Sequence, residues 1–128
     1  MKINRSAGAA LGIAAVLATS LATVTPAEAA ACEVQIGRTS KSGSQIVGYG
    51  SLSGCPSSST AQLFIQRQTA PGFWSRVSAI ATARQGYDVY VRYNCSGTGT
   101  QSYRTQINGT TIGGTAKIKN SNTIRVSC

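Results

Sequence analysis

Four cysteines are the feature of this sequence that most restricts its fold. They stand at positions 32, 55, 95 and 128 of a chain of 128 residues that contains no histidine. An even number of cysteines in so short a chain is typical of an exported domain held together by disulfides. A zinc site is disfavoured, because the sequence has no C-x-x-C pair and no histidine that could act as a ligand.

Two disulfides can be made from these cysteines in three ways. We favour Cys32–Cys55 and Cys95–Cys128, because cysteines that follow one another in the sequence each close one local segment. In the chain-entropy model, loops of these lengths contribute roughly 3–4 kcal/mol of stability per bridge. The two bridges would then restrain both ends of the segment between Cys32 and Cys128.

The amino-terminal segment has the composition of a secretory signal peptide. Lys2 and Arg5 precede an apolar run of Ala, Leu, Val and Ile, and the small residues Ala27 and Ala29 fit the A-x-A cleavage rule. We expect residues 1–29 to be removed and the product to be secreted, with cleavage after residue 31 as the alternative. A transmembrane anchor is disfavoured, because the apolar run is marginal for spanning a bilayer and ends in a cleavage motif.

The charge balance of residues 30–128 is strongly basic. Ten Lys and Arg stand against two side-chain carboxylates, Glu33 and Asp88. Such an excess attracts anionic partners, and a cell-surface polymer, a phospholipid surface or an acidic protein would suit an exported domain. Nucleic acid is not expected, because the sequence has neither a run of Lys and Arg nor a recognition helix.

Short runs of alternating apolar and polar residues, separated by turn residues, indicate an all-β fold. Strands are expected over residues 33–38, 45–52, 61–68, 73–84, 87–95, 103–107, 110–112, 115–119 and 123–128. We predict one domain over residues 30–128, a two-sheet antiparallel sandwich of immunoglobulin-like type with about 7–8 short strands; an open barrel is the alternative. Tyr93-Asn94-Cys95 resembles the Tyr-x-Cys of strand F in immunoglobulin domains.

Several turns and close contacts can also be predicted. Asn108-Gly109 favours a type I′ hairpin turn, because that turn needs a positive φ at both central residues. The strands at 115–119 and 123–128 are expected to pair with each other, and residues 40–43 are expected to form a turn. Gly48 and Gly50 either weaken their strand or mark a close approach of another segment.

Catalysis is not expected from this sequence. Without histidine there is no Ser-His-Asp triad and no Cys-His pair. Glu33 and Asp88 could form a glycosidase pair only if the fold brought them together, and no motif supports this. The glycines Gly97 and Gly99 are followed by neither a lysine nor a helix, so a phosphate loop is not expected. We predict a binding protein without cofactor or metal.

Aromatic and basic residues alternate along several expected strands, and Trp, Tyr and Arg are the usual anchors of protein interfaces. The candidates for contact with a partner are Phe73, Trp74, Arg76, Tyr90, Arg92, Tyr103 and Arg104. Alternation places Trp74 on the same face as Arg76, and Tyr90 on the same face as Arg92. The alternative roles are a tryptophan in the core and arginines that keep strand edges soluble.

The alanine-rich leader, the paired cysteines and the final Cys128 resemble the small exported proteins of actinobacteria such as Streptomyces. Two groups of these proteins are of interest. The tendamistat-like α-amylase inhibitors are also β-sandwiches with four cysteines, but their Trp-Arg-Tyr triplet is absent here, and Trp74-Ser75-Arg76 is the nearest match. The chain is also similar in size and layout to the small linker subunit of umbrella toxin particles, which joins a lectin subunit to a large toxin-bearing one.

Together these features predict a secreted, non-catalytic protein-binding module. The resemblance implies an adaptor that links other secreted proteins in an exported antibacterial complex. The alternatives are an inhibitor of a secreted hydrolase, such as an amylase or a protease, and a small cationic antimicrobial protein that acts alone.

Overall fold

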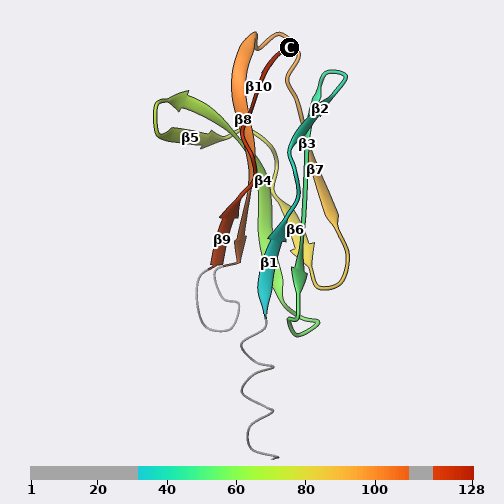
Figure 1. The fold of residues 1–128 in the computed structure, drawn as a ribbon. Coiled ribbons are helices and arrows are strands. Elements are labelled where there is room, and N and C mark those ends of the chain that lie inside the picture. Colours follow the sequence, from blue (N-terminus) through green and yellow to red (C-terminus); the bar gives the residue numbers. More distant parts are fainter. Residues whose placement is uncertain (1–31, 110–116) are drawn as a thin grey trace, which may run out of the picture. The chain divides into compact units, whose positions relative to one another are not determined.

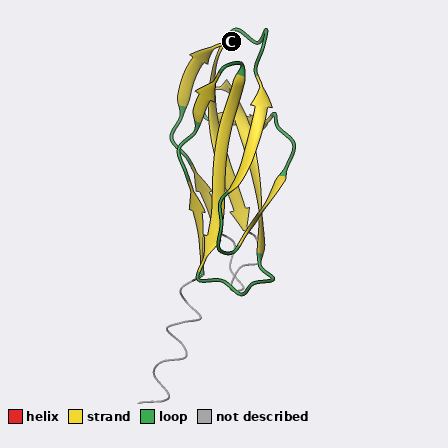
Figure 2. Cartoon of the chain, turned by 90° about the vertical axis from the view of Figure 1, so that its right-hand side faces the viewer, coloured by secondary structure: helices red, strands yellow, loops and turns green. Residues whose placement is uncertain are grey.

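The chain folds into short strands joined by turns and loops. A computed structural model describes residues 32–109 and 117–128, so the predicted signal segment at 1–29 and the predicted strand at 110–112 lie outside the described residues. Within the described part there are strands and loops only (Figure 2). The strands are β1 Glu33–Ile36, β2 Ser40–Ser42, β3 Gln45–Ser53, β4 Thr60–Ala70, β5 Phe73–Arg76, β6 Ala81–Arg84, β7 Val89–Asn94, β8 Thr100–Gly109, β9 Lys117–Asn120 and β10 Ile124–Ser127 (Figure 1).

The strands form two antiparallel sheets. In the first sheet β3 pairs with β7 on one side and with β1 and β2, one after the other, on its other side. In the second sheet β4 and β8 pair at the centre; β6 and β5 follow each other along the free side of β4, and β9 and β10 along the free side of β8. The predicted all-β fold with two antiparallel sheets is therefore confirmed.

Segments that follow one another along the same neighbour act as one interrupted edge strand. Counted in this way, the first sheet has the order β1/β2, β3, β7 and the second the order β5/β6, β4, β8, β9/β10. This is an immunoglobulin-like arrangement. The fourth strand in this count is β5/β6, and it belongs to the second sheet, whereas the fourth strand of a constant-type immunoglobulin domain belongs to the first. Tyr93 belongs to β7, which is the fifth strand in this count and pairs with β3, whereas strand F is the sixth strand of an immunoglobulin domain. The comparison of Tyr93 with strand F is therefore wrong.

The core lies between the two sheets, where alternate side chains of both point inward. Ile46 and Leu52 of β3 face Leu63, Ile65 and Ile107 of the second sheet, and all of these are fully buried. Gly48 shares the inward face of β3, and a Cβ at that position would overlap the side chain of Thr105. Of the two roles considered for the β3 glycines, close approach of the opposite sheet is therefore the correct one.

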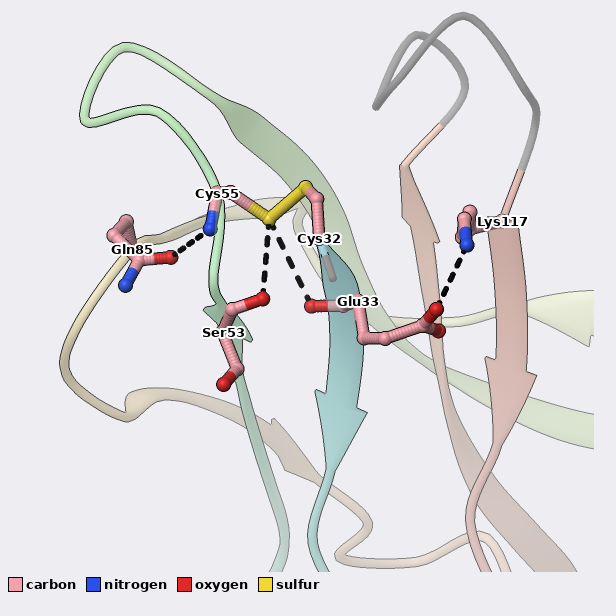
Figure 3. The surroundings of a disulfide bond; sticks show 6 residues. All are labelled: Cys32, Glu33, Ser53, Cys55, Gln85 and Lys117. Carbon is pink, nitrogen blue, oxygen red and sulfur yellow. Dashed lines mark hydrogen bonds and ion pairs between the residues drawn. A yellow bond between two sulfur atoms is a disulfide. The ribbon is translucent and has the colours of Figure 1, made fainter. Parts of the chain in front are cut away.

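Two disulfides hold the sandwich at opposite ends of the sequence. Cys32 pairs with Cys55 and Cys95 with Cys128, with Cα–Cα distances of 4.4 and 5.6 Å, so the favoured pairing is confirmed. The first bridge ties the start of β1 to the loop after β3, and the side-chain oxygen of Gln85 accepts a hydrogen bond from the Cys55 backbone N–H at 2.9 Å (Figure 3). Two disulfides are compatible with an oxidising environment.

A buried polar network closes one side of the sandwich. The hydroxyl of Thr39, in the gap between β1 and β2, lies 2.6 Å from the hydroxyls of Thr105 and Ser121. The Thr39 backbone N–H donates to Oδ1 of Asn122 at 2.9 Å. Ser121 and Asn122 lie in the gap between β9 and β10, so the network joins the interruptions of two edge strands that belong to different sheets.

The predicted strand at 73–84 is wrong as a single element, because it is interrupted between β5 and β6. At the interruption the hydroxyl of Ser78 accepts a hydrogen bond from the Ile65 backbone N–H at 2.8 Å. A side-chain oxygen therefore takes the place of a backbone acceptor beside β4, and β5 and β6 do not form one continuous edge strand. The predicted turn at 40–43 is also corrected. Residues 40–42 form β2, and the turn comes at Gly43, whose φ is 61°.

The two predicted carboxy-terminal hairpins are also wrong. Asn108 and Gly109 pair with Ile118 and Lys117 as the last residues of β8, so they are strand residues and not a turn. β9 and β10 do not pair with each other, because both lie along β8, β9 beside its second half and β10 beside its first half. The long central strand β8 has enough backbone hydrogen-bonding groups along one side to pair with both β9 and β10.

Candidate functional site

The outer face of the second sheet gathers arginines from three strands around one tryptophan. Gln66 of β4 lies directly between Arg76 of β5 and Arg104 of β8, and the neighbouring Gln68 lies opposite Trp74. Side chains directly opposite one another on antiparallel strands point to the same face. The inward positions of these strands are filled by Leu63, Ile65 and Ile107, so Arg76, Arg104 and Trp74 face outward.

Arg104 is held in place by an aromatic ring and a neutral amide. Its Cζ lies 4.2 Å from the centroid of the Trp74 ring, and its Nε donates a hydrogen bond to Oε1 of Gln66 at 2.8 Å. Partial burial lowers the pKa of the Arg104 guanidinium, yet an arginine stays protonated in a protein. Stacking on indole and one directed hydrogen bond fix the plane of the guanidinium.

A third arginine on this face is also positioned by a neutral group. Arg125 of β10 donates from Nη1 to the hydroxyl of Ser102 at 3.2 Å, and the two residues are cross-strand partners. We call the outward surface formed by Gln66, Trp74, Arg76, Ser102, Arg104 and Arg125 the arginine face. Within the described residues no carboxylate belongs to it: Glu33 binds Lys117 at 2.9 Å, and Asp88 precedes β7.

The outer face of the first sheet carries a second cluster of aromatic and basic side chains. Tyr49 of β3 and Tyr90 of β7 are cross-strand partners whose rings stack with centroids 5.2 Å apart. The guanidinium of Arg92 lies 5.9 Å from the centroid of Tyr90, which is 54% exposed. We call the surface formed by Val47, Tyr49, Tyr90 and Arg92 the tyrosine face.

A glycine allows the tyrosine face to form. The ring of Tyr49 lies against Gly37, whose N–H donates to the Tyr49 carbonyl at 2.9 Å. A Cβ at Gly37 would overlap this ring, so the missing side chain leaves the space that Tyr49 occupies. The position of the stacked tyrosine pair therefore depends on the absence of a side chain at Gly37.

The structure separates the candidate residues predicted from the sequence. Trp74, Arg76 and Arg104 come together on the arginine face, while Tyr90 and Arg92 lie on the opposite outer face of the sandwich. Phe73 is 68% exposed on the β4–β5 hairpin, which projects from the side of the sandwich (Figure 1). The candidates thus form two surfaces and not one.

Tyr103 does not belong to either surface, so its assignment as a partner-binding residue is corrected. It is 0% exposed, and its hydroxyl lies 3.0 Å from that of Thr98, which in turn donates to the Cys95 carbonyl at 2.7 Å. This resembles the tyrosine corner of immunoglobulin-like sandwiches, in which a tyrosine near the start of the sixth strand bonds to a residue a few positions upstream. Its role is to fix the loop between β7 and β8.

Five residues of the two faces were not among the candidates from the sequence: Val47, Tyr49, Gln66, Ser102 and Arg125. Arg125 alternates with Ile124 and Val126, and this pattern alone indicates an outward arginine. Gln66 and Tyr49 gain their roles from their cross-strand neighbours Arg104 and Tyr90. Strand register between distant segments cannot be read from one sequence, so no local signal marks these two residues.

The described residues form neither a cluster of potential metal ligands nor a membrane-spanning helix. Among residues 32–109 and 117–128, no group of three or more His, Cys, Asp and Glu side chains is placed to hold a metal ion. The same residues include no helix long and apolar enough to cross a membrane. Both surfaces instead present ordered aromatic rings and cations, which are suited to binding.

Comparison with protein families, curated proteins and solved structures finds no significant match for this chain.

Proposed function

We propose that this protein is a secreted, non-catalytic binding module that acts as an adaptor between other proteins of an exported antibacterial complex. The observation that carries the proposal is the presence of two ordered aromatic and cationic clusters on the two opposite outer faces of one small sandwich. A partner on one face leaves the other face accessible. Two such surfaces on a rigid, disulfide-linked domain are what an adaptor needs.

The tyrosine face is the surface that we assign to a protein partner. Tyr and Arg are enriched among the residues that dominate binding energy at protein interfaces. Tyr90 is more than half exposed, yet it stacks on Tyr49 and against Arg92, so little conformational freedom is lost on binding. The outward residues beside the pair on β3 include Val47 and Ser51, which leave room for a partner to approach the rings closely.

The proposal is tested by purifying the tagged full chain from the medium of a secreting host and identifying its partners by native size measurement and mass spectrometry. We expect a stoichiometric complex that is lost in Tyr90→Ser. Asn94→Ala is the matched control, because Asn94 is exposed on the same strand and its alternation places it on the same face. Elution of the wild type as a monomer without partner, or equal retention of partner by Tyr90→Ser and Asn94→Ala, would contradict the proposal.

Inhibition of a secreted hydrolase is the alternative outcome of the same experiment. It would replace our proposal if the purified protein blocked such an enzyme at a near-equimolar ratio and lost this effect on substitution of Trp74 or Arg76.

A further inference from the structure

The arginine face has a charge arrangement that the protein itself does not neutralise. Three of the ten Lys and Arg of the described residues, Arg76, Arg104 and Arg125, lie on it. The one ion pair formed within residues 32–109 and 117–128 is Lys117–Glu33, which lies elsewhere. Like charges that share a surface repel one another, so this grouping costs stability unless an anion binds there.

Two of these arginines are ordered by neutral partners, which leaves their charge available. Arg104 uses Nε for Gln66 and its face for Trp74, so its two Nη groups have no hydrogen-bond partner among the described residues. Arg125 uses Nη1 for Ser102. A guanidinium fixed in this way keeps a fork of donors that matches the geometry of a carboxylate or phosphate.

The spacing of the arginines indicates an extended ligand. Arg76 and Arg104 lie on either side of Gln66 in one row across three strands, and Arg125 lies beside Ser102 on the next strand. Because neighbouring strands are about 4.8 Å apart, the backbones of Arg76 and Arg104 are separated by roughly 10 Å. A single small anion cannot reach all three cations, whereas a polymer with repeated acidic groups can.

Carboxamides recur among the outward side chains of the second sheet, and Gln66, Gln68 and Gln106 lie beside the arginines or Trp74. The outward positions of the second sheet that carry an amide are Gln62, Gln66, Gln68, Gln106, Asn108 and Asn120. A carboxamide both donates and accepts hydrogen bonds, which suits ligands rich in hydroxyl groups. The core of a protein interface is instead centred on apolar and aromatic anchors. Here Arg104 already covers one face of the Trp74 ring, and the outward Phe64 is only 9% exposed. The exposed Ile118 lies beside Asn108, four residues along β8 from Arg104.

We propose that the arginine face binds an acidic polysaccharide, with the three arginines holding its carboxylate groups and the surrounding carboxamides its hydroxyls. This replaces one half of the proposed adaptor function, because it gives the arginine face a polymer and not a second protein as its ligand. It does not depend on the protein partner of the tyrosine face. If both proposals hold, the module attaches that partner to a polymer that carries negative charge.

The test uses the purified full-length mature protein and polygalacturonate, with its methyl-esterified form as the uncharged counterpart. Trp74 is the single tryptophan of the chain and lies in the site, so its fluorescence reports binding directly, and calorimetry gives the affinity. We expect saturable binding of polygalacturonate that weakens as salt is raised, and no binding of the ester. Binding of both forms, or of neither, would overturn the proposal.

Arg104→Met and Arg125→Met are the test variants, and Arg92→Met is their matched control. All three remove one positive charge from an outward strand position, but Arg92 lies on the tyrosine face. We expect each test variant to weaken polygalacturonate binding about tenfold, as for a lost hydrogen bond to a charged group, and Arg92→Met to leave it unchanged. Circular dichroism verifies that each variant is folded.

Two further outcomes would overturn the proposal. One is equal weakening by Arg92→Met, which would mean that net charge alone attracts the polymer. The other is tighter binding of polyglutamate or of single-stranded DNA than of polygalacturonate at the same salt concentration, which would assign the face to an acidic protein or a nucleic acid. Because the readout involves no protein partner, it is separate from the test of the adaptor function.

Discussion

The guanidinium of Arg104 lies over the indole of Trp74, with 4.2 Å between Cζ and the ring centroid, although 30 residues separate the two in the sequence. The contact exists because Gln66 of β4 brings β5 and β8 to its two sides. The contact therefore links the edge strand β5 to the central strand β8. The same contact orders one of the three arginines of the arginine face.

This contact predicts a measurable coupling between the two residues. In a double-mutant cycle with Trp74→Leu and Arg104→Met, measured by urea denaturation, we expect a coupling free energy of about 0.5–1 kcal/mol, as for a cation–π pair at a partly exposed site. Arg104→Met is also expected to shift the emission of the single tryptophan. The equivalent substitution of Arg84, which lies on β6, serves as the control and should leave the emission unchanged.

The buried hydroxyl network predicts a large effect of a substitution that barely changes shape. Thr39→Val removes a hydroxyl that bonds to both Thr105 and Ser121, and Thr105 is fully buried. A buried polar group without its partner costs about 1–3 kcal/mol, so the free energy of unfolding should fall by that amount. The same substitution at the exposed Thr82 of β6 should change it by less than about 0.5 kcal/mol. Equal effects at the two sites would argue against the network.

The features that were correctly predicted from the sequence are those that depend on local patterns. Alternation identified the strand at residues 61–68, which lies within β4, and the order of the cysteines identified both disulfides. Tyr103 was placed wrongly, although it shares its parity with Ile107, which is a core residue on the same strand. Alternation divides the residues of a strand between two faces. Which of the two faces is buried depends on where the second sheet lies.

The features that were missed depend on contacts between distant segments. Asn108-Gly109 has the composition of a tight turn, but pairing with Ile118 and Lys117 holds it in β8, so tertiary contacts override the turn preference. The break between β5 and β6 is the place where the Ser78 hydroxyl accepts a hydrogen bond from Ile65 of β4. The arginine face likewise depends on the register of four strands, which the composition of each strand does not specify.

The disulfides predict which region loosens when each is removed. Cys95→Ser with Cys128→Ser should lower the free energy of unfolding by roughly 3–4 kcal/mol, because the bridge closes a long loop of the unfolded chain. Hydrogen exchange should become faster first in β10, which ends next to Cys128 and pairs with the beginning of β8. Cys32→Ser with Cys55→Ser is the comparison, and there β1 should exchange faster while β10 is unaffected. The reverse pattern would contradict the structural roles assigned to the bridges.

The ion pair of Glu33 with Lys117 predicts how stability depends on pH. A hydrogen bond from Lys117, drawn in Figure 3, and the charge of this lysine lower the pKa of the Glu33 carboxyl below its ordinary value of 4.5. Lys119 adds a weaker attraction. The folded chain therefore binds this proton less readily than the unfolded chain does. The resulting stabilisation is present above pH 4.5 and is lost as the pH falls through the lowered pKa.

Thermal unfolding of the wild type and of Lys117→Met between about pH 7 and pH 2 tests this linkage. We expect the variant to be less stable at the upper end of the range and the difference to shrink steadily below pH 4.5, as Glu33 becomes protonated in both proteins. Lys41→Met removes an exposed charge of β2 and should keep the wild-type pH dependence. A difference between the wild type and Lys117→Met that stays constant down to the acid limit would mean that the lysine acts through packing of its alkyl chain and not through its charge, because packing does not respond to the protonation of Glu33.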